Sequence, residues 1–267
     1  MRLSLNVSLS YNDVPLLERP RAAAAAGFEA IEIWWPFSCP DPPRDDIAAL
    51  ASAIRSAGVK LALLNLYGGN LGAGDRGILS HPRSTEHFYA NLSAAIRLAE
   101  QTGCRTLNAL YGNRNMDKTE GASDELALRH LAAAARAAAD IGAFVVVESL
   151  NSVECPTYPL VTPDAVAALV QRVRGASGAE IGYLCDVYHL ACMGLDPASI
   201  IRKFGEMIRH IQVADFPGRG IPGSGSIRFA EVTAALKAAE FTGFIGVECR
   251  GSEQLSRQAL VGLMSLA

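Results

Sequence analysis

The chain has 267 residues, of which 50% are hydrophobic, and its 24 Lys and Arg nearly balance 27 Asp and Glu to give a net charge of −3. These interspersed charges lack the basic surface of a nucleic-acid-binding protein, and no stretch approaches the ~20 apolar residues that a membrane span needs. The N-terminus is too polar for a signal peptide, so we expect a cytoplasmic protein with neither nucleic-acid nor membrane partners.

A helix-like run, then a glycine, then an apolar strand recur along the chain. Gly27, Gly58 and Gly142 are examples, and each is followed within a few residues by an apolar run. Glycine ends helices because it adopts a left-handed conformation without a Cβ penalty. With an opening strand, the pattern predicts eight strands, at residues 3–7, 31–33, 61–64, 107–110, 144–147, 182–185, 210–211 and 244–247.

The segments between these strands are rich in Ala and Leu at helical spacing. The first predicted helix starts at a cap, Asp13, and continues through Ala26, with Pro20 expected to kink or shorten it. Ser123-Asp124 and Thr162 are further predicted caps. Other helices are predicted at residues 50–57, 87–102, 125–141, 163–174 and 229–239, and more weakly at 190–203, where Gly194 and Pro197 interrupt the pattern.

Four strands in the second half each end on a side chain that carries an oxygen. These side chains are Glu148, Asp186, Gln212 and Glu248, at spacings of 38, 26 and 36 residues, which match successive strand–helix units. A carboxylate after an apolar run is costly to bury unless something compensates it. Each could simply meet solvent at a strand end, but four in consecutive units favour a divalent-metal site. Oxygen ligands suit Mg²⁺ or Mn²⁺.

Eight alternating units in about 270 residues favour a closed (β/α)8 TIM barrel, a single domain over residues 1–267. An open doubly wound sheet is the alternative. The proposed ligands favour the barrel, because active groups there lie at the C-terminal ends of several strands. The two long loops, at residues 67–83 and 215–227, are expected to cover the site.

Three further residues are candidates for contact with a substrate. His189 follows Asp186 by three residues and could act as a hydrogen-bond donor. Arg219 and Arg76 lie in the two long loops, where each could clamp a carboxylate or phosphate or be simply solvated. The glycines at 218, 220 and 223 match a dinucleotide-binding pattern weakly, because prolines remove backbone donors there, and are interpreted as part of a mobile lid.

These residues resemble the hydroxypyruvate isomerase-like family of the xylose isomerase-like TIM barrels. The matching motifs lie at residues 28–32, 35–37, 72–78, 148–151, 186–189, 212–215, 217–219 and 246–248. The resemblance implies that Glu148, Asp186, Gln212 and Glu248 are metal ligands and that Glu148 and Glu248 transfer protons. It also implies that His189 and Arg219 contact substrate.

The expected function is metal-dependent aldose–ketose isomerisation of a small hydroxy-carbonyl acid in carbohydrate metabolism, as from hydroxypyruvate to tartronate semialdehyde. One glutamate would remove the proton beside the carbonyl, and a proton would return to the neighbouring carbon. Alternatives are a sugar 3-epimerase or dehydratase on the same scaffold, or a non-catalytic metal-dependent carbohydrate-binding protein. A small-molecule substrate is the expected partner, and a homo-oligomer is left open.

Overall fold

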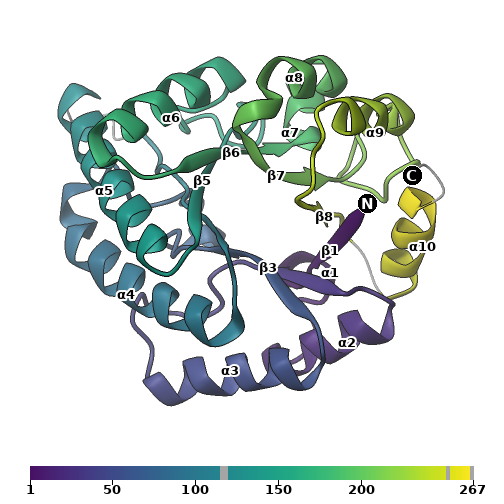
Figure 1. Cartoon of the computed structure of the whole chain (residues 1–267), viewed down its shortest axis with the longest axis horizontal. Helices are drawn as coiled ribbons and strands as arrows, with labels where there is room; N and C mark the ends of the chain where they lie inside the picture. Colours follow the sequence, from purple (N-terminus) through teal and green to yellow (C-terminus); the bar gives the residue numbers. More distant parts are fainter. Residues whose placement is uncertain (115–119, 251–252, 265–267) are drawn as a thin grey trace.

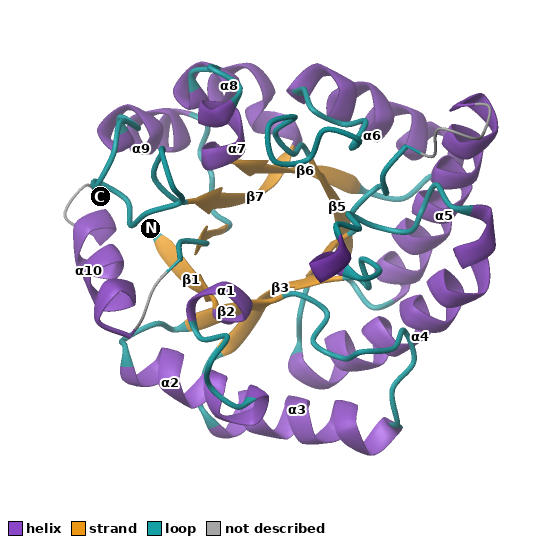
Figure 2. Ribbon diagram, turned by 180° about the vertical axis from the view of Figure 1, so that it is seen from behind, coloured by secondary structure: helices purple, strands orange, loops and turns teal. Residues whose placement is uncertain are grey.

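Eight parallel strands close into a barrel in the order β1 to β8 in the computed structural model, which describes residues 1–114, 120–250 and 253–264. Figures 1 and 2 look along this barrel from its two ends, with the helices in a ring around the strands. The predicted TIM barrel is therefore confirmed and the open sheet is wrong. The strands are β1 (Arg2–Asn6), β2 (Ala30–Ile33), β3 (Lys60–Asn65), β4 (Thr106–Asn108), β5 (Phe144–Glu148), β6 (Ile181–Asp186), β7 (Ile208–Val213) and β8 (Phe244–Val247).

The described α-helices are α1 (Val7–Ser10), α2 (Arg19–Ala25), α3 (Arg44–Ser56), α4 (Thr85–Thr102), α5 (Glu120–Asp140), α6 (Pro163–Ser177), α7 (Val187–Cys192), α8 (Pro197–Phe204), α9 (Phe229–Ala238) and α10 (Glu253–Met264). Most of them surround the strands, whereas the short helices α1 and α7 directly follow β1 and β6 at the C-terminal rim of the barrel. None of the described helices combines the length and the apolar character that would let it span a bilayer.

Alternation along β5 divides its side chains between two buried clusters. Val145 and Val147 belong to the large core between strands and helices, whereas Val146 joins Leu63 and Leu184 in a separate cluster inside the barrel. Since side chains two apart share a face of a strand, Glu148 points the same way as Val146, toward the barrel interior. The same alternation directs Asp186, two residues after Leu184, to the inside.

The helix predictions differ from the structure mainly at the helix ends. Asp13 is not a cap: the helix predicted from Asp13 to Ala26 starts only at Arg19, as α2, and Pro20 occupies its first turn, where a missing backbone N–H has no intrahelical partner to lose. Ser123-Asp124 lies inside α5. Thr162 does cap α6, accepting from the backbone N–H of Ala165. The weak segment 190–203 divides into α7 and α8 around Gly194.

Candidate active site

The four predicted metal ligands meet at the C-terminal rim of the barrel. Glu148, Asp186 and Glu248 are 1–5% exposed, and Gln212 is 1% exposed. On β7, Ile211 and Val213 belong to the outer core, so Gln212 between them faces inward. On β8, Ile245 and Val247 belong to the same core, so Glu248, directly after Val247, also faces inward. Residues far apart in the sequence are therefore gathered at one end of the barrel, as the strand-end pattern predicted.

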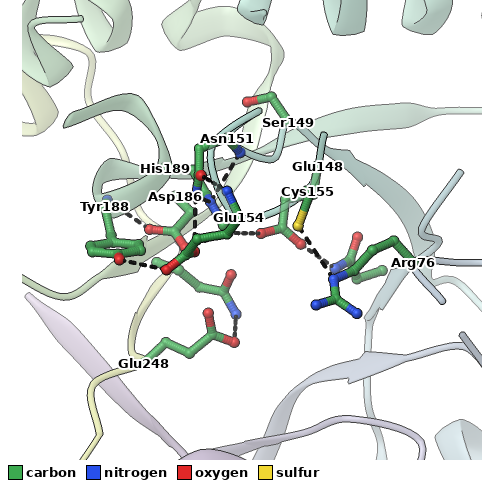
Figure 3. A network of polar contacts seen from close by, with 12 residues as sticks. Arg76, Glu148, Ser149, Asn151, Glu154, Cys155, Asp186, Tyr188, His189 and Glu248 are labelled. Carbon is green, nitrogen blue, oxygen red and sulfur yellow. Dashed lines mark hydrogen bonds and ion pairs between the residues drawn. The ribbon is translucent and has the colours of Figure 1, made fainter. Parts of the chain in front are cut away.

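Glu148, Asp186 and His189 form a buried group that could hold a metal ion, since one ligand atom of each lies within 4.8 Å of the others. His189 Nε2 is 3.5 Å from Asp186 Oδ2 and 3.7 Å from Glu148 Oε1. The backbone N–H of Asn151 donates to His189 Nδ1 over 3.1 Å. Figure 3 shows these side chains turned toward one another. The structure thus places His189 beside the carboxylates, closer than the sequence pattern required.

Arg219 brings positive charge to the same carboxylates. Its Nη2 lies 2.7 Å from Asp186 Oδ2 and 3.0 Å from Glu248 Oε2, and its guanidinium sits over the ring of Tyr188. The backbone of Arg219 is left-handed, with φ of 58°. A guanidinium held among carboxylates at this depth marks a site that attracts cations and can orient acidic or hydroxylated ligands.

The loop that carries Arg219 is organised by one carboxylate. Asp215 is fully buried, and its oxygens accept from the backbone N–H groups of Gly223, Gly225 and Ile227 over 2.8 to 3.0 Å. Three such bonds close the loop of residues 215–227 back on its own start. The glycine pattern therefore builds a structured turn beside the site and does not join strand to helix as a dinucleotide motif would.

Gln212 uses both hydrogens of its amide on carboxylates. Its Nε2 donates to Glu32 Oε2 over 2.8 Å and to Glu248 Oε1 over 3.1 Å. Its Oε1 is buried and has no hydrogen-bond partner among the described residues. A buried acceptor without a donor is costly, and a cation beside Glu248 and Asp186 would satisfy it. The donor set therefore fits a hard divalent ion such as Mg²⁺ or Mn²⁺.

Burial changes the acidity of the two glutamates. It raises the pKa of Glu148 well above its ordinary value, and the charges of Glu248 and Asp186 raise it further. Burial also raises the pKa of Glu248, to about 7, although the charge of Arg219 opposes the shift. The same cause lowers the pKa of His189 to about 4, so its ring is neutral at pH 7. A carboxyl group whose pKa is raised toward neutrality, as burial does for Glu248, is suited to proton transfer.

The sequence pattern missed the neutral donors that hold the glutamates. Asn108 Nδ2 donates to Glu148 Oε2 over 2.9 Å. Asn6 Nδ2 and Trp34 Nε1 donate to Glu248 Oε1 over 2.7 and 3.0 Å. Asn6 and Asn108 are the last residues of β1 and β4, but the predicted strands ran on to residues 7 and 110, so the strand-end pattern did not single these two amides out.

The rim encloses a cavity of about 330 Å³ that both glutamates, His189, Arg219 and Arg76 line. Arg76 lies on the side of Cys155, to whose sulfur its Nε donates over 3.3 Å, while its Nη1 donates to backbone oxygens of Leu71 and Asp75. Figure 3 shows Arg76 and Glu248 on different sides of the Glu148 carboxylate. All three predicted substrate contacts, His189, Arg219 and Arg76, thus line one cavity with two of the predicted ligands, Glu148 and Glu248.

The chain is similar to known proteins along nearly its whole length. The chain matches the family model of the xylose isomerase-like TIM barrel over residues 20–265. It is 44% identical over 261 residues to a Streptomyces coelicolor protein provisionally named hydroxypyruvate isomerase, covering 97% of this chain and 94% of that one. It is also 27% identical to the Escherichia coli hydroxypyruvate isomerase (93% of each chain) and 29% identical to the Cupriavidus necator 2-oxo-tetronate isomerase (93% and 92%).

A crystal structure described as an AP endonuclease, family 2, from Brucella melitensis superposes with a TM-score of 0.86 at 28% identity, over 99% of this chain and 98% of that one. The chain belongs to the xylose isomerase-like TIM barrel family, and within it to the hydroxypyruvate isomerase-like sugar and keto-acid isomerases.

Proposed function

We propose that this protein is a metal-dependent isomerase that interconverts hydroxypyruvate and tartronate semialdehyde. The observation that carries the proposal is the pair Glu148 and Glu248, which are both buried and line one small cavity with raised pKa values. A cavity of about 330 Å³ is at the small end of the range for ligand pockets, which favours a short substrate. Relatives whose names specify hydroxypyruvate or 2-oxo-tetronate as substrate support the same class.

Glu148 and Glu248 are proposed to exchange protons with adjacent carbons of the substrate. One takes a proton from the hydroxymethyl carbon, which leaves an enediolate. A proton then returns to the former carbonyl carbon, and the hydroxyl proton passes from one substrate oxygen to the other. The product has the same atoms as the substrate. General acid–base transfer of this kind requires carboxyl groups whose pKa lies near the working pH.

His189 and Arg219 are proposed to orient the substrate oxygens. Because the backbone N–H of Asn151 donates to Nδ1, the neutral ring carries its hydrogen on Nε2. Arg219 Nη2, a second donor, lies 3.1 Å from that nitrogen. Two donors in contact are unfavourable, and an acceptor oxygen of the substrate between them would relieve the arrangement.

The metal ion would be held by Glu148, Asp186, Gln212 and Glu248, with His189 beside them. When bound, a divalent ion would polarise the carbonyl and lower the free energy of the enediolate. If Asp186 and Glu248 were neutralised by the ion, Arg219 would be released from its two ion pairs and free to bind the substrate. Arg76, on the side of Cys155, is proposed to bind the substrate carboxylate.

Hydrogen exchange tests the proposal directly. Hydroxypyruvate is incubated in deuterated water with the Mn²⁺-loaded protein and followed by NMR. We expect deuterium at the exchanging carbon together with tartronate semialdehyde. Exchange in a ketose with inversion at the third carbon would indicate an epimerase, and loss of water a dehydratase. Tight binding of the acid without exchange would indicate a binding protein and would exclude the isomerase.

A further inference from the structure

Glu32 is a fully buried carboxylate in the wall of the barrel, below the rim. It lies on β2, with its Cα opposite that of Asn6 on β1. Its Oε1 accepts from Ser4 Oγ over 2.6 Å and from His210 Nε2 over 2.7 Å, and its Oε2 accepts from Gln212 Nε2 over 2.8 Å. These donors compensate the burial of the charge. Glu32 contributes no atom to the cavity lining at the rim, so its role must be exerted through a neighbour.

The neighbour through which Glu32 can act is Gln212, because its side-chain amide can point in either of two directions. An amide group has nearly the same shape whichever way its nitrogen and oxygen point, and only its hydrogen-bond partners decide the orientation. Glu32 Oε2 and Glu248 Oε1 are both acceptors, and each takes one hydrogen of Gln212 Nε2. The nitrogen is thereby held on their side, and Oε1 is left buried and without a partner. That oxygen is the atom a metal ion requires.

The barrel makes room for this contact at one glycine. Gly246 is paired with Gln212 across β7 and β8, and a Cβ placed on it would lie 1.9 Å from Glu32 Oε1. No side chain of any size fits there while Glu32 reaches Gln212. The glycine in β8 therefore leaves space for the carboxylate of Glu32, which projects from β2.

We propose that Glu32 is a positioning residue for the metal site: it holds the amide of Gln212 so that the oxygen, and not the NH2 group, faces the divalent ion. The inference rests on the metal site of the proposed function. Partners of metal ligands in other proteins typically change metal affinity by about 10- to 100-fold when removed, and a reversed amide would present a donor to a cation.

Replacement of the carboxylate tests the role through metal affinity. In the metal-free protein, Glu32→Leu removes both acceptors at similar volume, and Mn²⁺ titrated by calorimetry should bind about 10- to 100-fold more weakly than to wild type. The matched control is Ser4→Ala, which removes another hydrogen bond to Glu32 but none from Gln212. It should lower thermal stability and leave the Mn²⁺ affinity unchanged. Wild-type affinity in a folded Glu32→Leu protein would overturn the proposal.

A second measurement needs neither metal nor a variant at position 32. With glutamine labelled at its side-chain nitrogen, Gln212 should show amide hydrogens that exchange with deuterated water at least about tenfold more slowly than those of exposed Gln101 and Gln171. The Gln212→Glu protein, which lacks the signal, assigns it. Fast exchange at Gln212 in wild type would overturn the proposal. A wild type that binds no Mn²⁺ would instead refute the proposed function, and slow exchange would still show that the NH2 group of Gln212 is held in hydrogen bonds.

Discussion

The two halves of the barrel contribute different chemistry to the same rim. In the second half, Glu148 and Asp186 end β5 and β6, Gln212 is the next-to-last residue of β7, and Glu248 directly follows β8. These four residues are the ones proposed to hold the metal ion. Strands β1 and β4 in the first half end in amides, Asn6 and Asn108, which donate to the glutamates of the second half. The carboxylates proposed to react thus lie on one half of the barrel, and the amides that donate to them lie on the other.

The two glutamates differ in the number of neutral hydrogen-bond donors that support them. Oε1 of Glu248 accepts from three neutral donors, the side chains of Asn6, Trp34 and Gln212. Glu148 accepts from one neutral side-chain donor within hydrogen-bond distance among the described residues, Asn108. A carboxylate with few donors is held ionised less firmly in a buried site. We therefore expect Glu148 to be the more easily protonated of the pair.

The largest effect is expected from removal of the less supported carboxyl group. Glu148→Gln keeps the shape and should fold, but its amide cannot accept a proton from carbon, so kcat should fall by about 10²- to 10⁴-fold. The measurement is deuterium exchange into substrate by NMR. Glu180→Gln, at a side chain that is 69% exposed, is the matched control and should keep full activity. Wild-type turnover in Glu148→Gln would remove Glu148 from the mechanism.

Arg76 comes next, because it lines the first-half side of the cavity where the substrate carboxylate is proposed to lie. Arg76→Met should raise KM for hydroxypyruvate by about 10- to 100-fold, the usual size of a lost hydrogen bond to a charged group. Dihydroxyacetone, a ketol without a carboxylate, provides the comparison. Its slower conversion by wild type should be unaffected by the substitution. An equal loss for both substrates would show that Arg76 does not recognise the carboxylate.

The charged half of the site was predictable from sequence because burial makes it conspicuous. Glu148 follows three valines, and an apolar run that ends in a carboxylate needs a reason. The barrel was predictable for a different reason: helices that end at a glycine alternate regularly with short strands along the chain. Glu32, between Ile31 and Ile33, carried the same signal inside a strand but has no position at a strand end to single it out.

The supporting half was not predictable, because asparagine at the end of a strand is ordinary turn chemistry. Asn6 illustrates this, since its side chain also caps α1 by accepting from the backbone N–H of Ser8. Its hydrogen bond to Glu248 joins residues 242 positions apart, and only closure of the barrel brings them together. The start of α2 was also missed: Asp13 offered a cap, but the chain begins the helix at Arg19, where Pro20 fits the first turn.

A matched pair of substitutions tests whether the two glutamates are supported unequally by their hydrogen-bond donors. Asn108→Ala takes the amide donor from Glu148, and Asn6→Ala takes one of three from Glu248. We expect the acidic limb of the pH profile of kcat/KM to move upward by about one pH unit in Asn108→Ala and by clearly less in Asn6→Ala. The second variant should instead lose about 1 kcal/mol of stability with its helix cap. Equal shifts would contradict the unequal support.

The last expected effect is a change in how the stability of the folded protein varies with pH, and it separates the charged half from the rest of the molecule. The folded protein raises the pKa of Glu248 from 4.5 to about 7, so between these values the folded state binds more protons than the unfolded state. The metal-free protein should therefore lose stability from this group as pH rises through that window. A bound divalent ion requires the carboxylate and should reverse the trend, because metal and proton compete.

Thermal unfolding between about pH 5 and about pH 8, with EDTA or with Mn²⁺, measures both slopes. Subtraction of the profile of Glu248→Gln removes the contributions of all other groups. A difference that stays flat in EDTA would mean that Glu248 is ionised as easily as an exposed glutamate, and the site would then lack the strained charge that a metal ion is proposed to relieve.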